Sequence, residues 1–552
     1  MPWRRVNIMK INLRLILLFV TLLVVINTTS VAKKPRINMN HDSCSADNGL
    51  NPARIIINLG SKQQTIQSFG ASDCWTTKFI GKWNNVVKKN QIADYLFSMD
   101  VDRQGNPKGI GLTLWRFNIG AGSYEQGAAS GIPDEFRREE CFLDENNQYN
   151  WDKQAGQQWF LSAARARGVK KFLAFSVSPP IQFTKNNKAY GLGNSHLNLA
   201  EISKNAFADF LVSILKHFES IGTPFNYLSP FNEPQWNWGE KPSQEGTGAT
   251  NNEIADFVRL LGPKMKAAGL ATTICIGEAN QWNSLDGNDK DGRGDQINQF
   301  FNKTSTNYIG NVPSLEHLIS SHSYFTTCPD DNLISYRQHV ADKQKAVDPT
   351  LGLWQSEFGI LGNICDKLKG YPKNTGIDYG LYVAKVIHHD LTVANVTSWQ
   401  WWLAVDTYNY SDGLVYINDL NGGYDLNSMK TDGLISDSKQ LWCLGNYSRF
   451  VRPGMVRVNA SLSDVTDPVL AAETQMVSAY KDAGLKQFVI VVVNMSTESK
   501  QYTVDMGASQ PTGRTLDMYT TTVSKNLKKS TIPIGSITIE PRSVTTLTGC
   551  YQ

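Results

Sequence analysis

The sequence of 552 residues carries little net charge. Its 54 lysines and arginines nearly balance 50 aspartates and glutamates, which leaves a formal net charge of +4. So weak a charge gives no electrostatic footprint for nucleic acid, and no nucleic-acid partner is expected. Internal repeats and low-complexity segments are also absent, so a repeat architecture is not indicated.

Sequence signatures of several enzyme classes are missing as well. There is no His-Glu-x-x-His pattern and no closely spaced cysteine pair to suggest a zinc site, and His388-His389 lie in a predicted helix without a third ligand. A Gly-x-Ser-x-Gly turn and a phosphate-binding Gly-Lys-Ser/Thr loop are absent too. No metal and no cofactor are therefore expected.

The cysteines are scattered and define no disulfide framework. Eight cysteines allow about 105 complete pairings, so none is predicted, although an exported protein could oxidise some of them. Cys275 lies in an apolar, strand-like run and is predicted to be a free thiol in the core. The eight are Cys44, Cys74, Cys141, Cys275, Cys328, Cys365, Cys443 and Cys550.

Long apolar runs are absent except at the N-terminus. Four basic residues precede the apolar run 15–26, and Ser30-Val31-Ala32 offers a small-x-small cleavage site. This pattern predicts a secretory signal peptide over residues 1–32, followed by a polar leader over 33–52. An uncleaved anchor is the weaker alternative, because the run is shorter than the roughly 20 residues that cross a bilayer. We expect a secreted or periplasmic protein with no membrane span after signal removal.

Short apolar runs alternate with longer amphipathic segments between residues 67 and 450. Eight such units in order predict a parallel sheet closed into a (β/α)8 TIM barrel. An open, doubly wound α/β sheet is the alternative, but it usually has a glycine-rich phosphate loop after its first strand, which Phe69-Gly70-Ala71-Ser72 is not. The predicted strands are 67–73, 112–119, 171–177, 227–231, 272–277, 318–324, 352–355 and 396–403, and the predicted helices include 151–167, 200–220, 251–268, 331–347 and 377–394.

The pattern changes after Arg452-Pro453-Gly454. Short β-branched segments separated by turn residues predict a C-terminal antiparallel β-sandwich over 451–552. Residues 53–66 are assigned to the same domain, because this strand precedes the barrel and no helix follows it. The predicted strands of this domain are 474–480, 487–494, 501–506, 515–519 and 536–539.

Two glutamates stand at the ends of predicted barrel strands. Glu233 follows the fourth strand, and Glu357 ends the seventh. The carboxyl ends of all barrel strands open on one face, so both side chains are expected at the same mouth. Two facing carboxylates are what glycoside cleavage needs, since one protonates the leaving oxygen and the other attacks the anomeric carbon or activates water. A surface glutamate is the alternative for either site alone, and the pairing favours catalysis.

Further motifs accompany the two glutamates. They are Phe69-Gly70-Ala71-Ser72-Asp73-Cys74-Trp75, Trp115-Arg116-Phe117-Asn118-Ile119-Gly120, Ser178-Pro179-Pro180 and Ser229-Pro230-Phe231-Asn232-Glu233-Pro234-Gln235-Trp236. Together with the C-terminal sandwich, this set resembles glycoside hydrolase family 30, and within it the endo-β-1,6-galactanase-like branch. The resemblance covers nearly all of the chain after the signal.

The resemblance implies roles for four of these residues. Glu233 would be the general acid/base and Glu357 the nucleophile of a retaining reaction. Asn232 would hydrogen-bond the sugar 2-hydroxyl, and Arg116 would hold Glu357 in its ionised form. A structural ion pair at the barrel rim is the alternative for Arg116, and both interpretations are compatible.

Several other side chains are expected near the barrel mouth. His322 and Tyr324, after the sixth strand, could orient the nucleophile, with a satisfied core histidine as the alternative. Trp399 and Trp401 share one face of the eighth strand and could form the floor of the sugar site, with barrel packing as the alternative. Candidate sugar-binding walls are Trp75 and Trp236.

Two acids and one loop carry weaker signals. Glu278 and Glu125 are polar groups near the mouth, and the simpler interpretation of each is a loop acid or hydrogen-bonding residue. The family's usual aromatic residue after Ser-Pro-Pro is replaced by Ile181-Gln182-Phe183, so no sugar contact is assigned to that loop.

The sequence therefore predicts an exported retaining glycosidase whose partner is a β-linked polysaccharide. The resemblance implies internal β-1,6-galactosyl bonds of arabinogalactan side chains as the target, with β-1,6-glucanase, glucosylceramidase-like and xylanase specificities as alternatives. A non-catalytic carbohydrate-binding surface protein is an alternative of another class, which the presence of both glutamates disfavours. The oligomeric state is not predicted.

Overall fold

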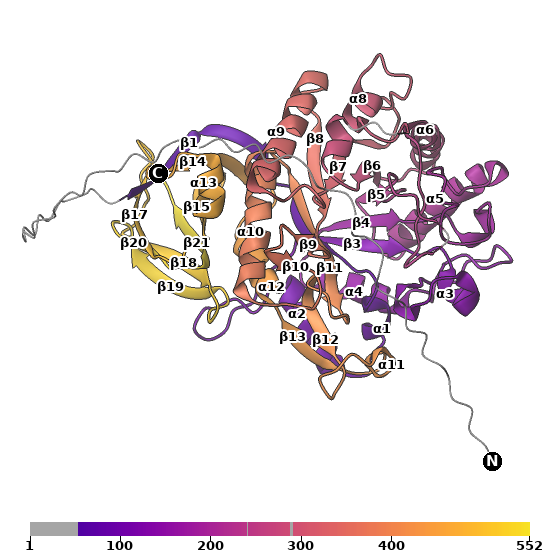
Figure 1. The fold of residues 1–552 in the computed structure, drawn as a ribbon, viewed down its shortest axis with the longest axis horizontal. Coiled ribbons are helices and arrows are strands. Elements are labelled where there is room, and N and C mark those ends of the chain that lie inside the picture. Colours follow the sequence, from indigo (N-terminus) through magenta and orange to yellow (C-terminus); the bar gives the residue numbers. More distant parts are fainter. Residues whose placement is uncertain (1–52, 240, 288–290) are drawn as a thin grey trace, which may run out of the picture. The chain divides into compact units, whose positions relative to one another are not determined.

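The computed structural model of the protein describes residues 53–239, 241–287 and 291–552 (Figure 1). The predicted signal peptide, the polar leader and Cys44 lie outside the described residues. Among the helices that are described, none is long and apolar enough to cross a membrane.

Within the described residues, parallel strands close into a barrel. They are β2 (Ser68–Ser72), β3 (Leu114–Ile119), β4 (Lys171–Ser176), β5 (Tyr227–Ser229), β6 (Thr273–Ala279), β7 (Leu315–His322), β8 (Gly352–Glu357) and β11 (Ser398–Asp406). Each pairs with the next, and β11 pairs in parallel with both β2 and β8, which closes the ring. All of the predicted barrel strands are present, so the predicted TIM barrel is confirmed and the open sheet is excluded.

The barrel strands are short and buried on both faces, as the continuous apolar runs predict. Every residue of β2, β3 and β5 is buried. β5 ends at Ser229, before the predicted end at residue 231, because Pro230 has no N–H for the ladder. This early end leaves Asn232 and Glu233 in the loop above the strand rather than within it.

Amphipathic helices surround the barrel in the order that the sequence predicts. The main ones are α4 (Ala155–Ala166), α5 (Lys204–Ser220), α6 (Asn251–Ala267), α9 (Asp330–Val347) and α10 (Ile377–Thr392). α6 shows why these segments are helical. It begins with a capping box between Thr250 and Glu253, and Ile254, Val258 and Leu261 recur at helical spacing on its buried face.

The C-terminal strands form a second, largely antiparallel sheet, with strand order β19-β18-β21-β16-β15-β14-β1-β17-β20. Its strands are β1 (Ala53–Thr65), β14 (Val456–Leu462), β15 (Gln475–Asp482), β16 (Gln487–Asn494), β17 (Lys500–Asp505), β18 (Thr515–Thr521), β19 (Lys528–Pro533), β20 (Ile537–Ile539) and β21 (Ser543–Cys550). β1 pairs antiparallel with β14 and parallel with β17, so the strand before the barrel joins this sheet. In Figure 1, β1 lies among the yellow C-terminal strands.

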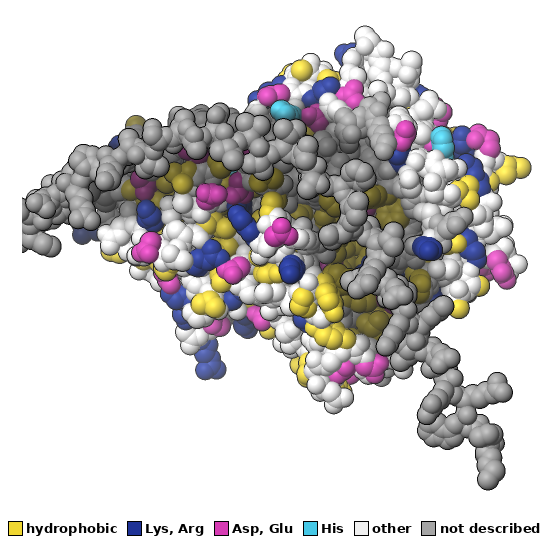
Figure 2. All heavy atoms as spheres, in the orientation of Figure 1, with side chains coloured by type: hydrophobic (Ala, Val, Ile, Leu, Met, Phe, Trp, Pro, Cys, Tyr) yellow, Lys and Arg dark blue, Asp and Glu magenta, His cyan; other side chains and the backbone are white. Residues whose placement is uncertain are grey.

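Helices of the barrel layer pack against the second sheet. α10 contacts β15, β16 and β21, and α12 (Lys439–Ser448) contacts β18 and β21. Asn446 Nδ2 donates to Thr546 Oγ1 at 3.0 Å, and the Thr546 hydroxyl donates back to the Asn446 carbonyl at 2.7 Å. On the face shown in Figure 2, acidic and basic side chains are interspersed rather than gathered by sign.

Candidate active site

Glu233 and Glu357 lie above the carboxyl ends of β5 and β8 and line one cavity of about 410 Å³. A carboxylate oxygen of Glu233 lies within 4.8 Å of one of Glu357. Glu357 is the last residue of β8, whereas Glu233 sits in the loop with a φ of 46°, a left-handed conformation that is uncommon for glutamate and frequent at functional sites. The Glu233 N–H donates to the Glu278 carbonyl at 2.9 Å, which fixes this conformation.

Arg116 joins three of the site's polar side chains. From the middle of β3, its Nη1 donates to Glu357 Oε2 at 2.6 Å, and its Nη2 donates to Asn232 Oδ1 and Glu278 Oε2, both at 2.8 Å. Burial alone would lower the pKa of Arg116, but the Glu278 and Glu357 carboxylates outweigh it and raise that pKa. The guanidinium is therefore a fixed positive charge that also holds the Asn232 amide in place.

His322, the last residue of β7, bridges the carboxylates. Its Nδ1 lies 3.0 Å from Glu233 Oε1 and 3.5 Å from Glu357 Oε1, and its Nε2 lies 3.1 Å from Glu278 Oε2. Burial would lower the pKa of His322, but the Glu357 charge and the hydrogen bonds with Glu233 and Glu278 raise it to about 10. This raised pKa favours the imidazolium, the form in which both ring nitrogens are donors.

Glu278 is the counter-ion of these two cations. It lies in β6 with a φ of 42° and also accepts from the Ser229 hydroxyl at 2.9 Å. Burial opposes its ionisation, but Arg116 and His322 more than compensate and lower the pKa of Glu278 to about 2. The sequence predicts Glu278 only as a polar group near the mouth, with a loop acid or a hydrogen-bonding residue as the simpler interpretation, and its position at the end of a barrel strand is the signal for its place in the site.

The environments of Glu233 and Glu357 differ in the way that acid/base catalysis needs. Burial, together with the Glu357 charge, raises the pKa of Glu233 against the opposing effects of His322 and Arg116. Glu357 accepts from Arg116 and, at 3.1 Å, from the Tyr324 hydroxyl. The site thus holds one carboxyl group whose pKa is raised beside a second carboxyl group that two donors align.

These residues are a poor metal site despite their proximity. Glu233, His322 and Glu357 are close enough to offer three ligand atoms to one ion. A histidine binds a metal ion only through a neutral imidazole. The raised pKa of His322 favours protonation of both ring nitrogens, and both already face carboxylates. The donor set fits a proton network better than a cation.

Aromatic side chains form the upper walls of the cavity. Trp236 and Phe325 are 40% and 68% exposed, with ring centres 5.9 Å apart, and Trp238 and Trp402 also line the cavity. Exposed rings beside buried carboxylates suit stacking against sugar faces. The prediction for Trp236 agrees with this placement. Phe325, Trp238 and Trp402 were not identified from the sequence.

The predicted floor of Trp399 and Trp401 is wrong. Both rings are fully buried, and neither lines the cavity. The Trp399 indole donates to Asp390 Oδ2 at 2.8 Å, and the Trp401 indole donates to the Asp412 carbonyl at 2.6 Å. The register of β11 shifts after Trp401, at the point where Trp402 turns toward the cavity.

Two further side chains that were predicted near the barrel mouth do not line the cavity. Trp75 is buried and does not line it, but its ring packs edge-on at 5.0 Å behind Trp402 and so supports that wall. Glu125 forms an ion pair with Lys153 at 3.0 Å instead of facing the carboxylates.

The sequence profile of O-glycosyl hydrolase family 30 matches residues 52–416, which is more than half of the chain. The chain belongs to this family. It is therefore a glycosidase, and its substrates are glycans. The family assignment that the motifs implied is confirmed.

Similar proteins support the same fold. A conserved exported protein from Bacteroides fragilis has a crystal structure that is 35% identical in sequence, with a TM-score of 0.84, covering 90% of this chain and 100% of that chain. Endo-β-1,6-galactanase from Hypocrea rufa is 24% identical over 477 residues, 83% of this chain and 84% of that protein. The catalytic domain of a xylanase from Talaromyces cellulolyticus is 23% identical, with a TM-score of 0.65, covering 90% of this chain and 99% of that chain.

One wall of the family 30 glycosidase is fastened by a disulfide. Cys328, in the loop after β7, bonds to Cys365, in the loop after β8, and both residues line the cavity. The sequence offered no basis for choosing this pair among the possible pairings. Cys275 is buried and free, as predicted.

Removal of this disulfide in a Cys328→Ser/Cys365→Ser variant is expected to raise KM severalfold, because the two loops are then free to move apart, while kcat changes less. Unfolding should become easier by about 2–4 kcal/mol, as expected for a bridge that constrains the unfolded chain. Steady-state kinetics and denaturant unfolding measure both effects. Cys550→Ser, at an exposed free thiol, is the control. Equal KM values with and without the bridge would contradict a role for it in the cavity wall.

Glu278→Gln is expected to move the alkaline limb of the pH–activity profile to lower pH. Removing this negative charge leaves the two cations Arg116 and His322 with less compensation. Their field then favours ionisation of Glu233, so its pKa falls and its acid form is lost earlier as pH rises. The profile of kcat/KM against pH measures the shift. Ser229→Ala removes one hydrogen bond from an uncharged hydroxyl to Glu278 and should leave the alkaline limb at nearly the same pH. A limb that moves to higher pH would contradict this account.

Proposed function

We propose that the protein is an exported, retaining endo-β-1,6-galactanase acting on arabinogalactan side chains. The spacing of Glu233 and Glu357 supports retention most directly. Retaining glycosidases hold their two carboxyl groups about 5–5.5 Å apart, whereas inverting ones leave about 6.5–9.5 Å for a water molecule. Closest oxygens within 4.8 Å agree with the first geometry.

In this mechanism the reaction has two steps. Glu357 attacks the anomeric carbon while Glu233 gives its proton to the leaving oxygen, and a covalent glycosyl–Glu357 ester forms. Glu233 then takes a proton from water, which attacks the anomeric carbon and releases Glu357. Arg116 and Tyr324 align Glu357, His322 holds Glu233 through Nδ1, and Asn232 is fixed by Arg116 for contact with the sugar 2-hydroxyl.

The galactan specificity is supported by the motifs around Glu233 and by the likeness to the Hypocrea rufa galactanase. To test this, the wild-type protein is incubated separately with β-1,6-galactan, β-1,6-glucan, xylan and glucosylceramide. Product sizes are followed over time, and NMR identifies which anomer of the product forms first. We expect rapid shortening of galactan with β products. Preferred cleavage of another glycan would replace the substrate assignment, and α products would overturn retention. N-terminal sequencing of exported protein tests cleavage after residue 32.

A further inference from the structure

Ser323 lies between two residues that contact the catalytic carboxyl groups. His322 ends β7 and contacts Glu233, and the Tyr324 hydroxyl donates to Glu357. Ser323 itself does not line the cavity, because alternation along the chain turns its side chain toward the surrounding helices. It is fully buried, and its N–H donates to the Glu357 carbonyl at 3.1 Å. The position of this one residue therefore sets the positions of the partners of both carboxyl groups.

A fully buried ion pair holds the Ser323 hydroxyl from its outer side. Arg337, in α9, and Asp390, in α10, have no exposed side-chain surface, and Arg337 Nε lies 2.5 Å from Asp390 Oδ1. The Ser323 hydroxyl donates to Asp390 Oδ2 at 3.1 Å and accepts from Arg337 Nη2 at 3.3 Å. Arg337 Nη1 also donates to the Thr326 carbonyl at 2.8 Å, in the loop that follows Ser323. Both members of the ion pair thus bind this part of the chain.

Two buried tryptophans complete the network. The Trp399 indole donates to Asp390 Oδ2 at 2.8 Å, and the Trp282 indole donates to the Ser323 hydroxyl at 3.0 Å. None of the polar side-chain atoms of Ser323, Arg337 and these three partners lacks a hydrogen bond. A buried polar network whose members are all satisfied is rigid and specifies one arrangement. The Ser323 hydroxyl, which accepts two hydrogen bonds and donates one, is therefore fixed in direction.

Stability alone does not account for the Arg337–Asp390 pair. Replacing a buried ion pair by apolar side chains of similar volume is often neutral or stabilising, because burying two charges is costly. Apolar side chains could fill the space between α9 and α10, but they could not offer Ser323 both an acceptor and a donor. Accurate placement matters beside a reacting pair, since a displacement of about 1 Å can lower a rate by about 10²-fold.

We propose that Ser323, Arg337 and Asp390 form a positioning unit for the glycosidase reaction. The ion pair orients the Ser323 hydroxyl, and Ser323 in turn holds His322 and Tyr324 against the two catalytic carboxyl groups. All three members lie outside the cavity lining, so they are positioning residues and not catalytic ones. This inference rests on the proposed reaction of the two glutamates and adds the part of the fold that fixes their partners.

Ser323→Ala is the first test, because it removes the hydroxyl and leaves the ion pair and the backbone in place. We expect kcat on the glycan that the wild-type protein cleaves to fall about tenfold, with KM changed less, since misalignment acts in the transition state. The alkaline limb of kcat/KM should also move to higher pH. His322 lowers the pKa of Glu233 through its hydrogen bond and its charge, so a looser contact lets that pKa rise.

A titration of His322 tests the inference without any substrate. The charged groups around its ring are Glu233, Glu278 and Glu357, and Arg116 is bound to the last two. These carboxyl groups raise the pKa of His322, so the alanine variant should lower it by about one pH unit as the contacts loosen. NMR of protein with 15N-labelled histidine measures this pKa, and the spectrum of His322→Gln identifies the signal.

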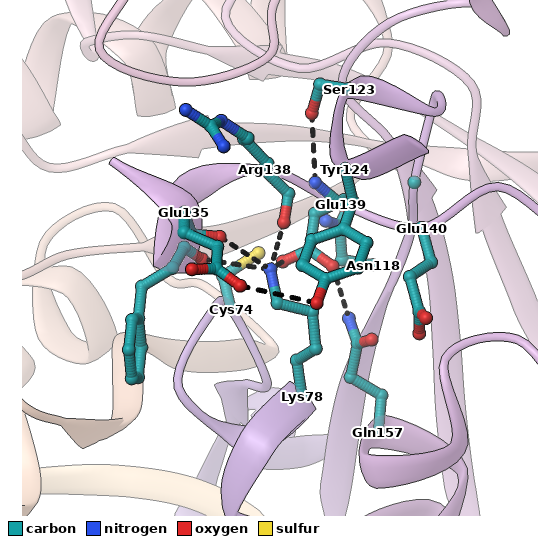
Figure 3. A network of polar contacts seen from close by, with 12 residues as sticks. Cys74, Lys78, Asn118, Ser123, Tyr124, Glu135, Arg138, Glu139, Glu140 and Gln157 are labelled. Atoms are coloured by element: carbon teal, nitrogen blue, oxygen red, sulfur yellow. Dashed lines mark hydrogen bonds and ion pairs between the residues drawn. The ribbon is translucent and has the colours of Figure 1, made fainter. Parts of the chain in front are cut away.

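Ser123→Ala is the matched control. Ser123 is also fully buried, and its hydroxyl donates to Glu245 Oε1 at 2.6 Å and accepts from the Glu139 N–H at 3.0 Å. It lies beside a second fully buried ion pair, in which Lys78 Nζ is 3.9 Å from Glu139 Oε1 (Figure 3). None of these four residues lines the catalytic cavity. We therefore expect Ser123→Ala to keep kcat, the alkaline limb and the pKa of His322.

Asp390→Asn tests the ion pair itself. The double variant Ser323→Ala/Asp390→Asn should lose no more kcat than Asp390→Asn alone, because both changes break one connection. An additive loss would overturn the unit, and so would an unchanged kcat or an unchanged His322 pKa in Ser323→Ala, or equal effects of Ser123→Ala. If the wild-type protein cleaves none of the four glycans, the proposed function fails, whereas the titration of His322 still decides this inference.

Discussion

Replacement of Glu357 by glutamine is expected to lower kcat on β-1,6-galactan by about 10³-fold or more, the scale of loss when a group that acts in bond breaking is removed. The amide cannot form the glycosyl ester, and it no longer presents a charge to Arg116. Reducing-end release under saturating substrate measures the effect. The amide keeps the volume of the side chain, so the protein should still fold and bind glycans.

The chemical role of Glu357 can be separated from a structural one. A Glu357→Ala variant with added azide should release the α-glycosyl azide from an activated β-galactoside, because the small nucleophile attacks from the face that the carboxylate occupied. Asp517→Asn, at an exposed ion pair on β18 of the second sheet, is a distant control that should keep full activity. Full activity in Glu357→Gln, or a β-glycosyl azide from Glu357→Ala, would exclude Glu357 as the nucleophile.

The barrel could be predicted from the sequence because its signal is strong and local. Each strand is a short apolar run bounded by turn residues, and each is followed by a helix with a buried stripe. The second sheet was harder. β14, β19 and β21 escaped prediction, since many polar residues leave little hydrophobic alternation in them. Lys528, Ser530 and Thr531 of β19 are exposed, whereas Ser543, Thr545 and Thr546 of β21 are polar although they are buried. Pairing across more than 390 residues, as between Ile55 and Leu462, has no local signal.

The candidate site, too, could be predicted only in part from the sequence. Glu233 and Glu357 could be identified because strand ends of a barrel share one face. The partners of these residues depend on distances that alternation cannot give, which is why the sequence does not predict that Glu278 contacts Arg116 and His322. The prediction for Trp399 and Trp401 of β11 was wrong for a simple reason. Period-two alternation predicts which rings share a side, but not which side faces the cavity, and the irregular register after Trp401 changes the phase.

Replacement of Glu233 by glutamine is the second change with a large expected effect. Glutamine cannot protonate the leaving oxygen, so kcat/KM on galactan should fall by about 10²–10⁴-fold, the range for loss of a general acid. The loss should depend on the substrate. The nitrophenolate of a nitrophenyl β-galactoside can leave without protonation, so the first step with this substrate should be nearly intact. The glycosyl–Glu357 ester should then accumulate, because no base activates water for the second step. A burst of nitrophenol followed by slow turnover measures this behaviour.

The pH dependence of the Glu233→Gln variant follows from the same role. In the wild-type protein the raised pKa of Glu233 keeps the acid form present to higher pH than for an ordinary glutamate, and activity should fall as pH rises through that pKa. The variant has no such group, so its alkaline limb on the nitrophenyl substrate should disappear. Azide should restore turnover and yield the β-glycosyl azide, since the glycosyl–Glu357 ester is attacked from the face that Glu233 serves. The opposite azide anomers from the Glu233 and Glu357 variants would then assign the two carboxyl groups to opposite faces of one sugar. A Glu233→Gln protein that kept both its galactan activity and its alkaline limb would show that another group donates the proton.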